Sequence, residues 1–181
     1  MRSIAVVGTR RPTAIQQERC RAVVAAALAE GWEIVTGGAP GIDAAAITAA
    51  TGAGQARRVI LVLPWANFGN WRDRQLRRVI FDREVHGDWL ATAKRLHPAP
   101  GRVSPGAWSL LARDVGIVAM AEMVAAFPQG SARSGGTGFS CRVAESFGKP
   151  VYADLGWASD EGVQRQVLEA IRAGGAAGAA R

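Results

Sequence analysis

The feature that most constrains the fold is a series of short apolar runs separated by alanine-rich stretches. Apolar runs span residues 3–8, 33–36 and 58–63, and a glycine or a proline lies at or just after the end of each. Runs that are apolar on both faces are typical of strands buried in a parallel sheet. The intervening residues, 13–29 and 42–51, have helical composition. This strand-helix-strand-helix-strand order predicts an α/β fold with right-handed crossovers.

The alternation of predicted strands and helices resumes after residue 105. The sequence predicts helices at 106–121, 142–147 and 160–173, and strands at 123–127 and 150–153. A chain of 181 residues suits one domain. We therefore expect a single Rossmann-like domain over residues 1–173, with three α/β/α layers and a mainly parallel sheet of about five or more strands. Residues 174–181, rich in Gly and Ala, are expected to form a flexible tail.

Residues 65–105 interrupt this alternation and are expected to form an Arg/Trp-rich helical insertion. Two helices are expected, near 71–84 and 87–96. If the first is helical, Arg74, Arg77 and Arg78 share one face. That face could be solvated, could serve as a nucleotide lid or a homodimer interface, or could grip single-stranded nucleic acid.

Composition indicates the cellular compartment and the classes of ligand to expect. The net charge is +7, and almost all of the positive charge is arginine, a good partner for phosphate. The two cysteines, Cys20 and Cys141, have no metal-ligand spacing and are expected to be buried structural thiols in a reducing cytoplasm. No apolar run reaches membrane-spanning length. We expect a cytoplasmic protein with no metal, no membrane contact and no cofactor other than a nucleotide as ligand or substrate.

Three glycine-bearing loops follow predicted strands, where the helix N-termini of a doubly wound sheet converge on ligands. They are residues 8–12, 37–43 and 128–138. Glycines let backbone amides approach a phosphate closely. The predicted ligand-binding residues are Gly8, Thr9, Arg10, Gly37, Gly38, Ala39, Gly41, Ile42, Asp43, Arg113, Ser134, Gly135, Gly136 and Thr137.

These loops resemble those of the Smf/LOG (SLOG) superfamily, and most closely its DprA-like branch. The resemblance is carried by Val6-Val7-Gly8-Thr9-Arg10, by residues 35–46 (Val-Thr-Gly-Gly-Ala-Pro-Gly-Ile-Asp-Ala-Ala-Ala) and by a Gly-Gly-Thr loop after Ala126-Phe127-Pro128. It covers most of residues 3–153 apart from the insertion. It implies a Rossmann-like fold whose loops hold a nucleotide or the phosphates of a nucleic acid.

Two departures from the superfamily pattern bear on function. The LOG enzymes carry a catalytic glutamate just after their Gly-Gly-x-Gly-Thr loop, whereas the nearest acid here, Glu145, lies two helical turns past Thr137. The DprA-like branch commonly has an Arg-Asn pair where this chain has Arg113-Asp114.

Three functions follow from these observations. The leading hypothesis is binding of a nucleotide or a nucleotide-derived small molecule without turnover. The alternatives are a LOG-like phosphoribohydrolase that cleaves the N-glycosidic bond, with Arg113, Asp114 and Glu122 as catalytic candidates, and a DprA-like protein that binds single-stranded DNA. Self-association as a homodimer is compatible with each.

Overall fold

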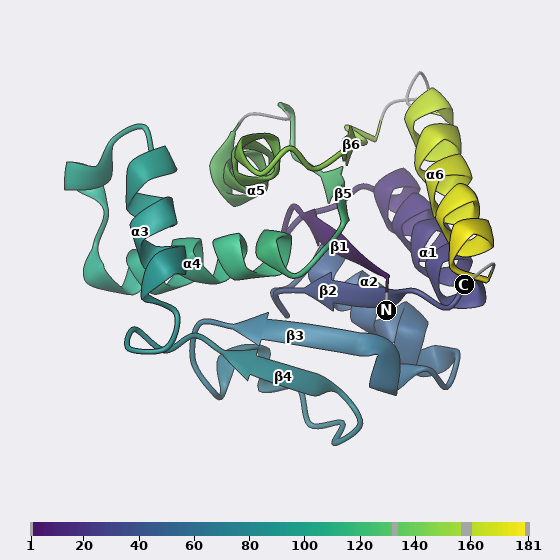
Figure 1. Ribbon diagram of the computed structural model, residues 1–181, viewed down its shortest axis with the longest axis horizontal. Helices are drawn as coiled ribbons and strands as arrows, with labels where there is room; N and C mark the ends of the chain where they lie inside the picture. Colours follow the sequence, from purple (N-terminus) through teal and green to yellow (C-terminus); the bar gives the residue numbers. More distant parts are fainter. Residues whose placement is uncertain (1, 132–133, 157–160, 180–181) are drawn as a thin grey trace.

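A six-stranded, all-parallel sheet forms the centre of the computed structural model, which describes residues 2–131, 134–156 and 161–179 (Figure 1). The strand order is β4-β3-β2-β1-β5-β6. The strands are β1 (Ser3–Gly8), β2 (Glu33–Thr36), β3 (Val59–Leu63), β4 (Arg77–Ile80), β5 (Met123–Phe127) and β6 (Val151–Ala153). The chain proceeds outward from β1 to β4 and then crosses to the other side for β5 and β6. The carboxyl ends of β1 and β5 therefore flank a topological switch point, where open α/β sheets bind ligands.

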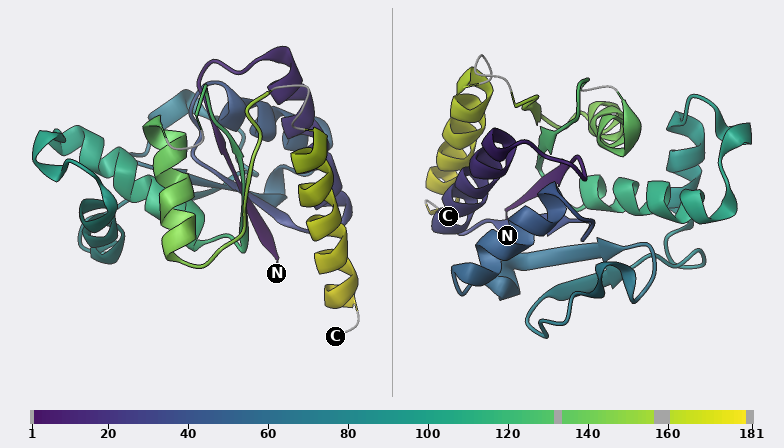
Figure 2. Two further views of the ribbon diagram at one scale, coloured as in Figure 1. Left: turned by 90° about the horizontal axis from the view of Figure 1, so that it is seen from above. Right: turned by 180° about the vertical axis from the view of Figure 1, so that it is seen from behind.

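Helices cover both faces of the sheet, which confirms the three-layer Rossmann-like α/β prediction. The helices are α1 (Ala14–Ala29), α2 (Ile42–Gly52), α3 (Gly87–Leu96), α4 (Pro105–Ala119), α5 (Gly135–Ser146) and α6 (Glu161–Ala179), with short 3-10 turns η1 (Ala56–Arg58), η2 (Phe68–Asn70) and η3 (Pro100–Arg102). Figures 1 and 2 show α1 and α6 side by side, away from α3, α4 and α5.

The alternation of side chains along the strands divides the core in two. In β1, Ile4 and Val6 pack with residues of α1, α2 and α6, whereas Ala5 and Val7 pack with residues of α4 and α5. All four are buried. A period of two along a strand buried on both faces explains why the sequence shows a continuous apolar run here.

The prediction of a helix near 71–84 is wrong. Residues 77–80 form β4, an edge strand paired with β3. Arg77 forms an ion pair with Glu33, and Arg78 Nη2 donates to the carbonyl oxygens of Trp71 and Asp73 at 2.7 and 2.9 Å. The arginines at 74, 77 and 78 therefore do not share a helical face, and two of them are bound within the molecule. The second predicted helix of the insertion, 87–96, is confirmed as α3.

Two helix boundaries also differ from prediction. Helix α5 begins at Gly135 rather than at 142, and α6 continues to Ala179 rather than ending at 173, so residues 174–179 continue this helix. Alanine favours the helical state, and Gly174 packs so closely on the Trp32 ring that a Cβ would lie 2.3 Å from it. Residues 180–181 lie outside the described chain.

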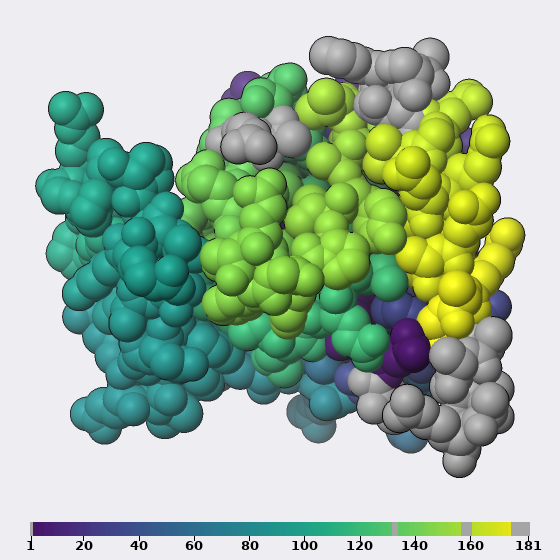
Figure 3. Space-filling model, turned by 45° about the horizontal axis from the view of Figure 1, so that its top comes forward, coloured from purple at the N-terminus to yellow at the C-terminus, as the bar shows by residue number. Residues whose placement is uncertain are grey.

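Helix α3, in the teal region of Figure 3, packs on α4, and α4 packs on the sheet and on α5. The ring of Trp89 fixes α3 on α4, because a Cβ on Gly116 would lie 2.3 Å from the ring. Among the described residues, no helix is long and apolar enough to cross a membrane.

Candidate functional site

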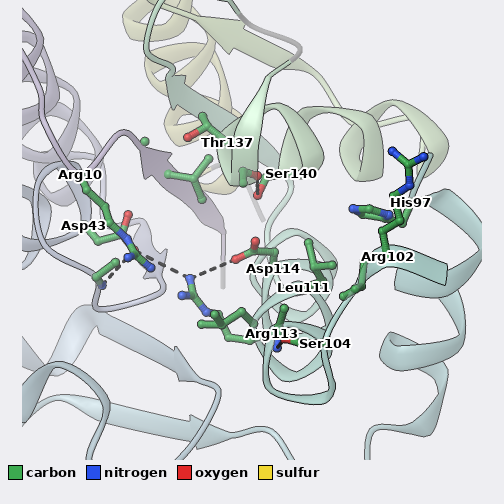
Figure 4. Close-up of a pocket in the computed structure, with 17 residues that line it drawn as sticks. Arg10, Asp43, His97, Arg102, Ser104, Leu111, Arg113, Asp114, Thr137 and Ser140 are labelled. Atoms are coloured by element: carbon green, nitrogen blue, oxygen red, sulfur yellow. Dashed lines mark hydrogen bonds and ion pairs between the residues drawn. The ribbon is translucent and has the colours of Figure 1, made fainter. Parts of the chain in front are cut away.

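A cavity of about 510 Å³ lies at the switch point between β1 and β5 (Figure 4). Its wall combines the end of β1, the loop into α2, one face of α4, the first turns of α5 and the segment between α3 and α4. The lining residues are Val7, Gly8, Arg10, Ala39, Asp43, His97, Arg102, Val103, Ser104, Ala107, Leu110, Leu111, Arg113, Asp114, Gly136, Thr137 and Ser140.

A second hollow, also of about 510 Å³, adjoins the first. Gly8, Arg10, Gly136 and Thr137 line both, so the two hollows meet along these residues. The second hollow is completed by Thr9, Arg11, Gln129, Ser134 and Gly135. The loops after β1 and β5 thus lie together, as the sequence predicted. Residues 132 and 133 of the second loop lie outside the described chain.

Backbone amides of the loop at 37–43 bind a carboxylate of the protein itself. The backbone amide of Ala39 donates to Asp43 Oδ2 at 3.2 Å, and the Gly37 amide also hydrogen-bonds this carboxylate. Asp43 is buried, as is the first part of its loop. Two of the amides that the sequence assigned to phosphate, those of Gly37 and Ala39, are therefore occupied by a carboxylate of the protein itself. The Ile42 amide donates to the Thr9 carbonyl oxygen.

The glycines of this loop permit close packing. A Cβ on Gly37 would lie 1.8 Å from Arg113 Nη1. Gly41 has φ +86°, and a Cβ there would lie 2.3 Å from the Thr9 carbonyl oxygen. The other predicted residues of the loop have different surroundings. The Gly38 carbonyl accepts a hydrogen bond from Trp71 Nε1 at 2.8 Å, and Ile42 is fully buried in the core. Of the loop residues, only Ala39 and Asp43 line the cavity.

Arg113 forms the centre of a buried charge cluster (Figure 4). Its Nη1 lies 3.0 Å from Asp114 Oδ1 and 3.9 Å from Asp43 Oδ2, and its guanidinium lies over the ring of Phe68 at 5.3 Å. Its Nε is buried and has no hydrogen-bond partner in the described chain. Burial raises the pKa of Asp114 to about 6, against the opposing effect of Arg113, and burial likewise raises the pKa of Asp43. Because two carboxylates already face Arg113, its charge is compensated locally.

Among the described residues, no side-chain cap occupies the first-turn amides at the N-terminus of α5. The first-turn N–H groups of a helix have no intrahelical partners, and the helix dipole makes this end attractive to anions. The Ser134 side chain does not cap these amides, because its Oγ donates instead to the Ser131 carbonyl at 3.1 Å. Gly135 and Gly136 are exposed, as are Arg10 and Arg11 across the second hollow. This end of the site suits a phosphate.

The structure separates Glu122 from the other catalytic candidates. It lies just before β5, at the opposite edge of the sheet, and its carboxylate pairs with Arg2 at 3.6 Å. Asp114 and Arg113 line the cavity. Within the described residues, no group of three or more His, Cys, Asp or Glu side chains is placed to hold a metal ion.

Sequence reasoning missed most of one wall of the cavity. Ala107, Leu110 and Leu111 line it from α4, beside the predicted Asp114. Their spacing of three and four residues was a usable signal, since it places them on one helical face. His97, Arg102 and Ser104 complete this side, and the Nδ1 of His97 accepts from the Ala99 amide at 3.2 Å.

Comparison with known proteins identifies the family. The family model described as DNA recombination-mediator protein A matches residues 1–177. The chain belongs to this family. Its membership confirms the SLOG resemblance and the DprA-like branch. A search of curated proteins finds no match.

Solved structures show the same fold. DNA processing protein A from Helicobacter pylori, described with a single-stranded DNA binding mode, matches at 20% identity with a TM-score of 0.56, over 84% of this chain and 64% of that one. DprA from Streptococcus pneumoniae matches at 22% identity and 0.59, over 93% and 56%. The protein TM1055 matches at 20% and 0.54, over 83% and 72%. This DprA-family chain thus spans between about half and three quarters of the length of these proteins.

Proposed function

We propose that this protein binds single-stranded DNA at the carboxyl edge of its sheet. Backbone phosphates would lie in the hollow at the N-terminus of α5, and one base would enter the adjoining cavity. The observation that carries the proposal is the junction of the two hollows at Arg10, Gly136 and Thr137. A nucleotide unit has the same division into a charged phosphate and an uncharged aromatic base.

The phosphate end combines a helix N-terminus with exposed arginines. Arg10 and Arg11 follow β1 and line the second hollow together with Ser134, Gly135 and Gly136. Backbone amides and guanidinium groups both hydrogen-bond phosphate oxygens, and they do so without regard to base sequence. Removing one such contact weakens binding to all strands and lowers its salt dependence.

The base end is a cavity with apolar walls. Val7, Val103, Leu110 and Leu111 line it, and its volume of about 510 Å³ lies within the range of small-molecule sites. Enclosing a base costs least where the strand is single, because a duplex base must first be unpaired from its partner. This geometry favours a single strand over a duplex.

Family membership favours DNA over a free nucleotide. The relative from Helicobacter pylori is described by its binding of single-stranded DNA, and this chain shares its fold. The net charge of +7 also favours a polyanion. A free nucleoside monophosphate would fit the same two hollows, so this second candidate, the leading hypothesis from the sequence alone, is tested beside the first.

Fluorescence anisotropy of a labelled 12-nucleotide oligothymidylate, measured over a salt series, tests the proposal. We expect Gly136→Asp to weaken binding roughly tenfold or more, because it places a carboxylate in the first turn of α5. The matched control is Gly162→Asp, since Gly162 is also the second residue of a helix, is exposed and has open space around it.

A second pair of variants tests the arginine. Arg10→Ala should lower the slope of log K against log salt by about 0.7, the value for one phosphate contact on a single strand. Arg57→Ala, an exposed arginine in η1 at the opposite edge of the sheet, should leave the slope unchanged. Absence of binding, equal affinity for Gly136→Asp and wild type, or binding of nucleoside monophosphates alone would overturn the proposal.

A further inference from the structure

The inner end of the base cavity presents hydrogen-bond acceptors. Asp114 lines it with a carboxylate whose Oδ1 pairs with Arg113, while its Oδ2 lies on the side of Gly136, 3.7 Å from where a Cβ on that glycine would be. Ser140 also lines the cavity, and its hydroxyl donates to the Gly136 carbonyl at 3.2 Å. With its hydrogen used in this way, the Ser140 oxygen is left to accept. Figure 4 shows both side chains beside the first turns of α5.

The bases differ in what they can offer such a surface. Guanine carries two adjacent donors on its Watson–Crick edge, the ring N1–H and the exocyclic N2–H₂, which match the two oxygens of a carboxylate. Adenine and cytosine place a single amino group beside a ring nitrogen that is an acceptor, and thymine places its single N–H between two carbonyls. A carboxylate pairs with adjacent donors and is repelled by adjacent acceptors.

We propose that this cavity selects guanine, through the carboxylate of Asp114 and with the hydroxyl of Ser140 as a further acceptor. This rests on the proposed function, because it concerns the base that enters when a single strand binds. The apolar side chains Val7, Leu110 and Leu111 line part of the same cavity, so a base bound there would displace water from apolar surface. A hydrogen bond to a charged partner discriminates more strongly where water is excluded.

The selectivity should depend on pH, because a protonated Asp114 offers a donor where guanine also offers donors. Burial raises the pKa of Asp114 to about 6. The charged groups that act on it are Arg113 from its own helix, Asp43 from α2 and Arg10 from the loop after β1. His97 and Arg102 line the same cavity from the segment between α3 and α4. The guanine preference should therefore be full at pH 7.5 and decline as the pH falls through about 6.

Competition with five-nucleotide strands tests the inference. Each strand is oligothymidylate with one central position occupied by guanine, hypoxanthine, adenine, cytosine or thymine, and it competes with the labelled oligothymidylate on the full chain. We expect the guanine strand to bind roughly tenfold more tightly than the adenine, cytosine and thymine strands. The hypoxanthine strand, which lacks only the N2 amino group, should be intermediate.

Variants attribute the preference to one side chain. Asp114→Asn should abolish the guanine preference and its pH dependence. Glu122→Gln, which changes a half-exposed carboxylate at the opposite edge, should keep both. If Asp114→Asn does not fold, the guanine–hypoxanthine comparison on the wild-type chain decides.

The outcomes separate the two proposals. Binding of all five strands with equal affinity would overturn guanine selection and leave single-strand binding intact. A preference for adenine or cytosine at pH 7.5, or a guanine preference that survives in Asp114→Asn, would also overturn it. If no strand binds, the proposed function itself fails.

Discussion

Replacing Gly37 by alanine should destabilise the protein through the buried charge cluster. The added Cβ would lie 1.8 Å from Arg113 Nη1, 2.6 Å from Cζ and 3.0 Å from Asp43 Oδ2. The end of an exposed arginine could move away, but this guanidinium is buried, pairs with Asp114 at 3.0 Å and lies over Phe68. Moving it leaves two buried carboxylates less well paired.

Breaking a buried ion pair costs about 3–5 kcal/mol, and the loop relaxes in part, so we expect a loss of about 3 kcal/mol. For a chain of this size each kcal/mol lowers Tm by roughly 2–4 °C, so Tm should fall by about 6–12 °C. Differential scanning calorimetry measures this directly. The matched control is Gly52→Ala at the end of α2, where nothing lies within 4 Å of the new Cβ and Tm should not fall. A Gly37→Ala variant that melts within about 1 °C of wild type would refute the reasoning.

Three further predictions concern titratable side chains. The raised pKa of Asp114, about 6 in the folded state against an ordinary value of 3.8, means that the folded state binds its proton more tightly. The contribution of this protonation to stability is therefore full below about pH 4 and is lost as the pH rises through 6. In denaturant titrations, the free energy of unfolding of wild type should rise by up to about 3 kcal/mol between pH 7.5 and pH 4, relative to that of Asp114→Asn. Burial raises the pKa of Cys20 to about 12 and of Cys141 to about 11, so a thiol reagent at pH 8 should label them only on unfolding, and rapid labelling of the native protein would contradict this. Lys149 Nζ donates to the carbonyl oxygens of Val118, Ala119 and Ala121 at and just after the end of α4. Lys149→Met should therefore lower the free energy of unfolding by about 1–2 kcal/mol in denaturant titrations. An unchanged unfolding midpoint would show that these hydrogen bonds make no net contribution to stability.

The sequence was sufficient to predict the buried strands and their parallel arrangement. β1, β2, β3 and β5 are buried along nearly their whole length, so most of their residues are apolar and the strands stand out from the helices around them. β4 was missed because it is an edge strand. Three of its four residues are exposed, and its two arginines give it the composition of a helix surface. Charged side chains are common on such edges.

The start of α5 was missed for a different reason. Gly135-Gly136-Thr137-Gly138 has low intrinsic helix propensity, yet the helix begins there because the following residues, Phe139, Cys141 and Val143, are buried against the sheet. Burial of these side chains outweighs the local preference of the glycines.

The sequence predicted where the site would lie but not how its parts are used. Loops that follow β1, β2 and β5 must meet at one edge of the sheet, so their convergence follows from topology alone. That Asp43 would occupy the amides of its own loop depends on the neighbouring Arg113, which is distant in sequence. Tertiary packing thus uses two amides of the 37–43 loop within the protein and places the glycines of this loop around a charge cluster.

The most direct test of the account is a crystal structure of this chain with a five-nucleotide single strand. The account predicts a phosphate within hydrogen-bond distance of the backbone amides of Gly136 and Thr137 and near Arg10, with one base in the cavity beside Asp114. A strand bound along residues 72–83, or a phosphate on the amides of Gly37 and Ala39 in place of Asp43, would contradict it.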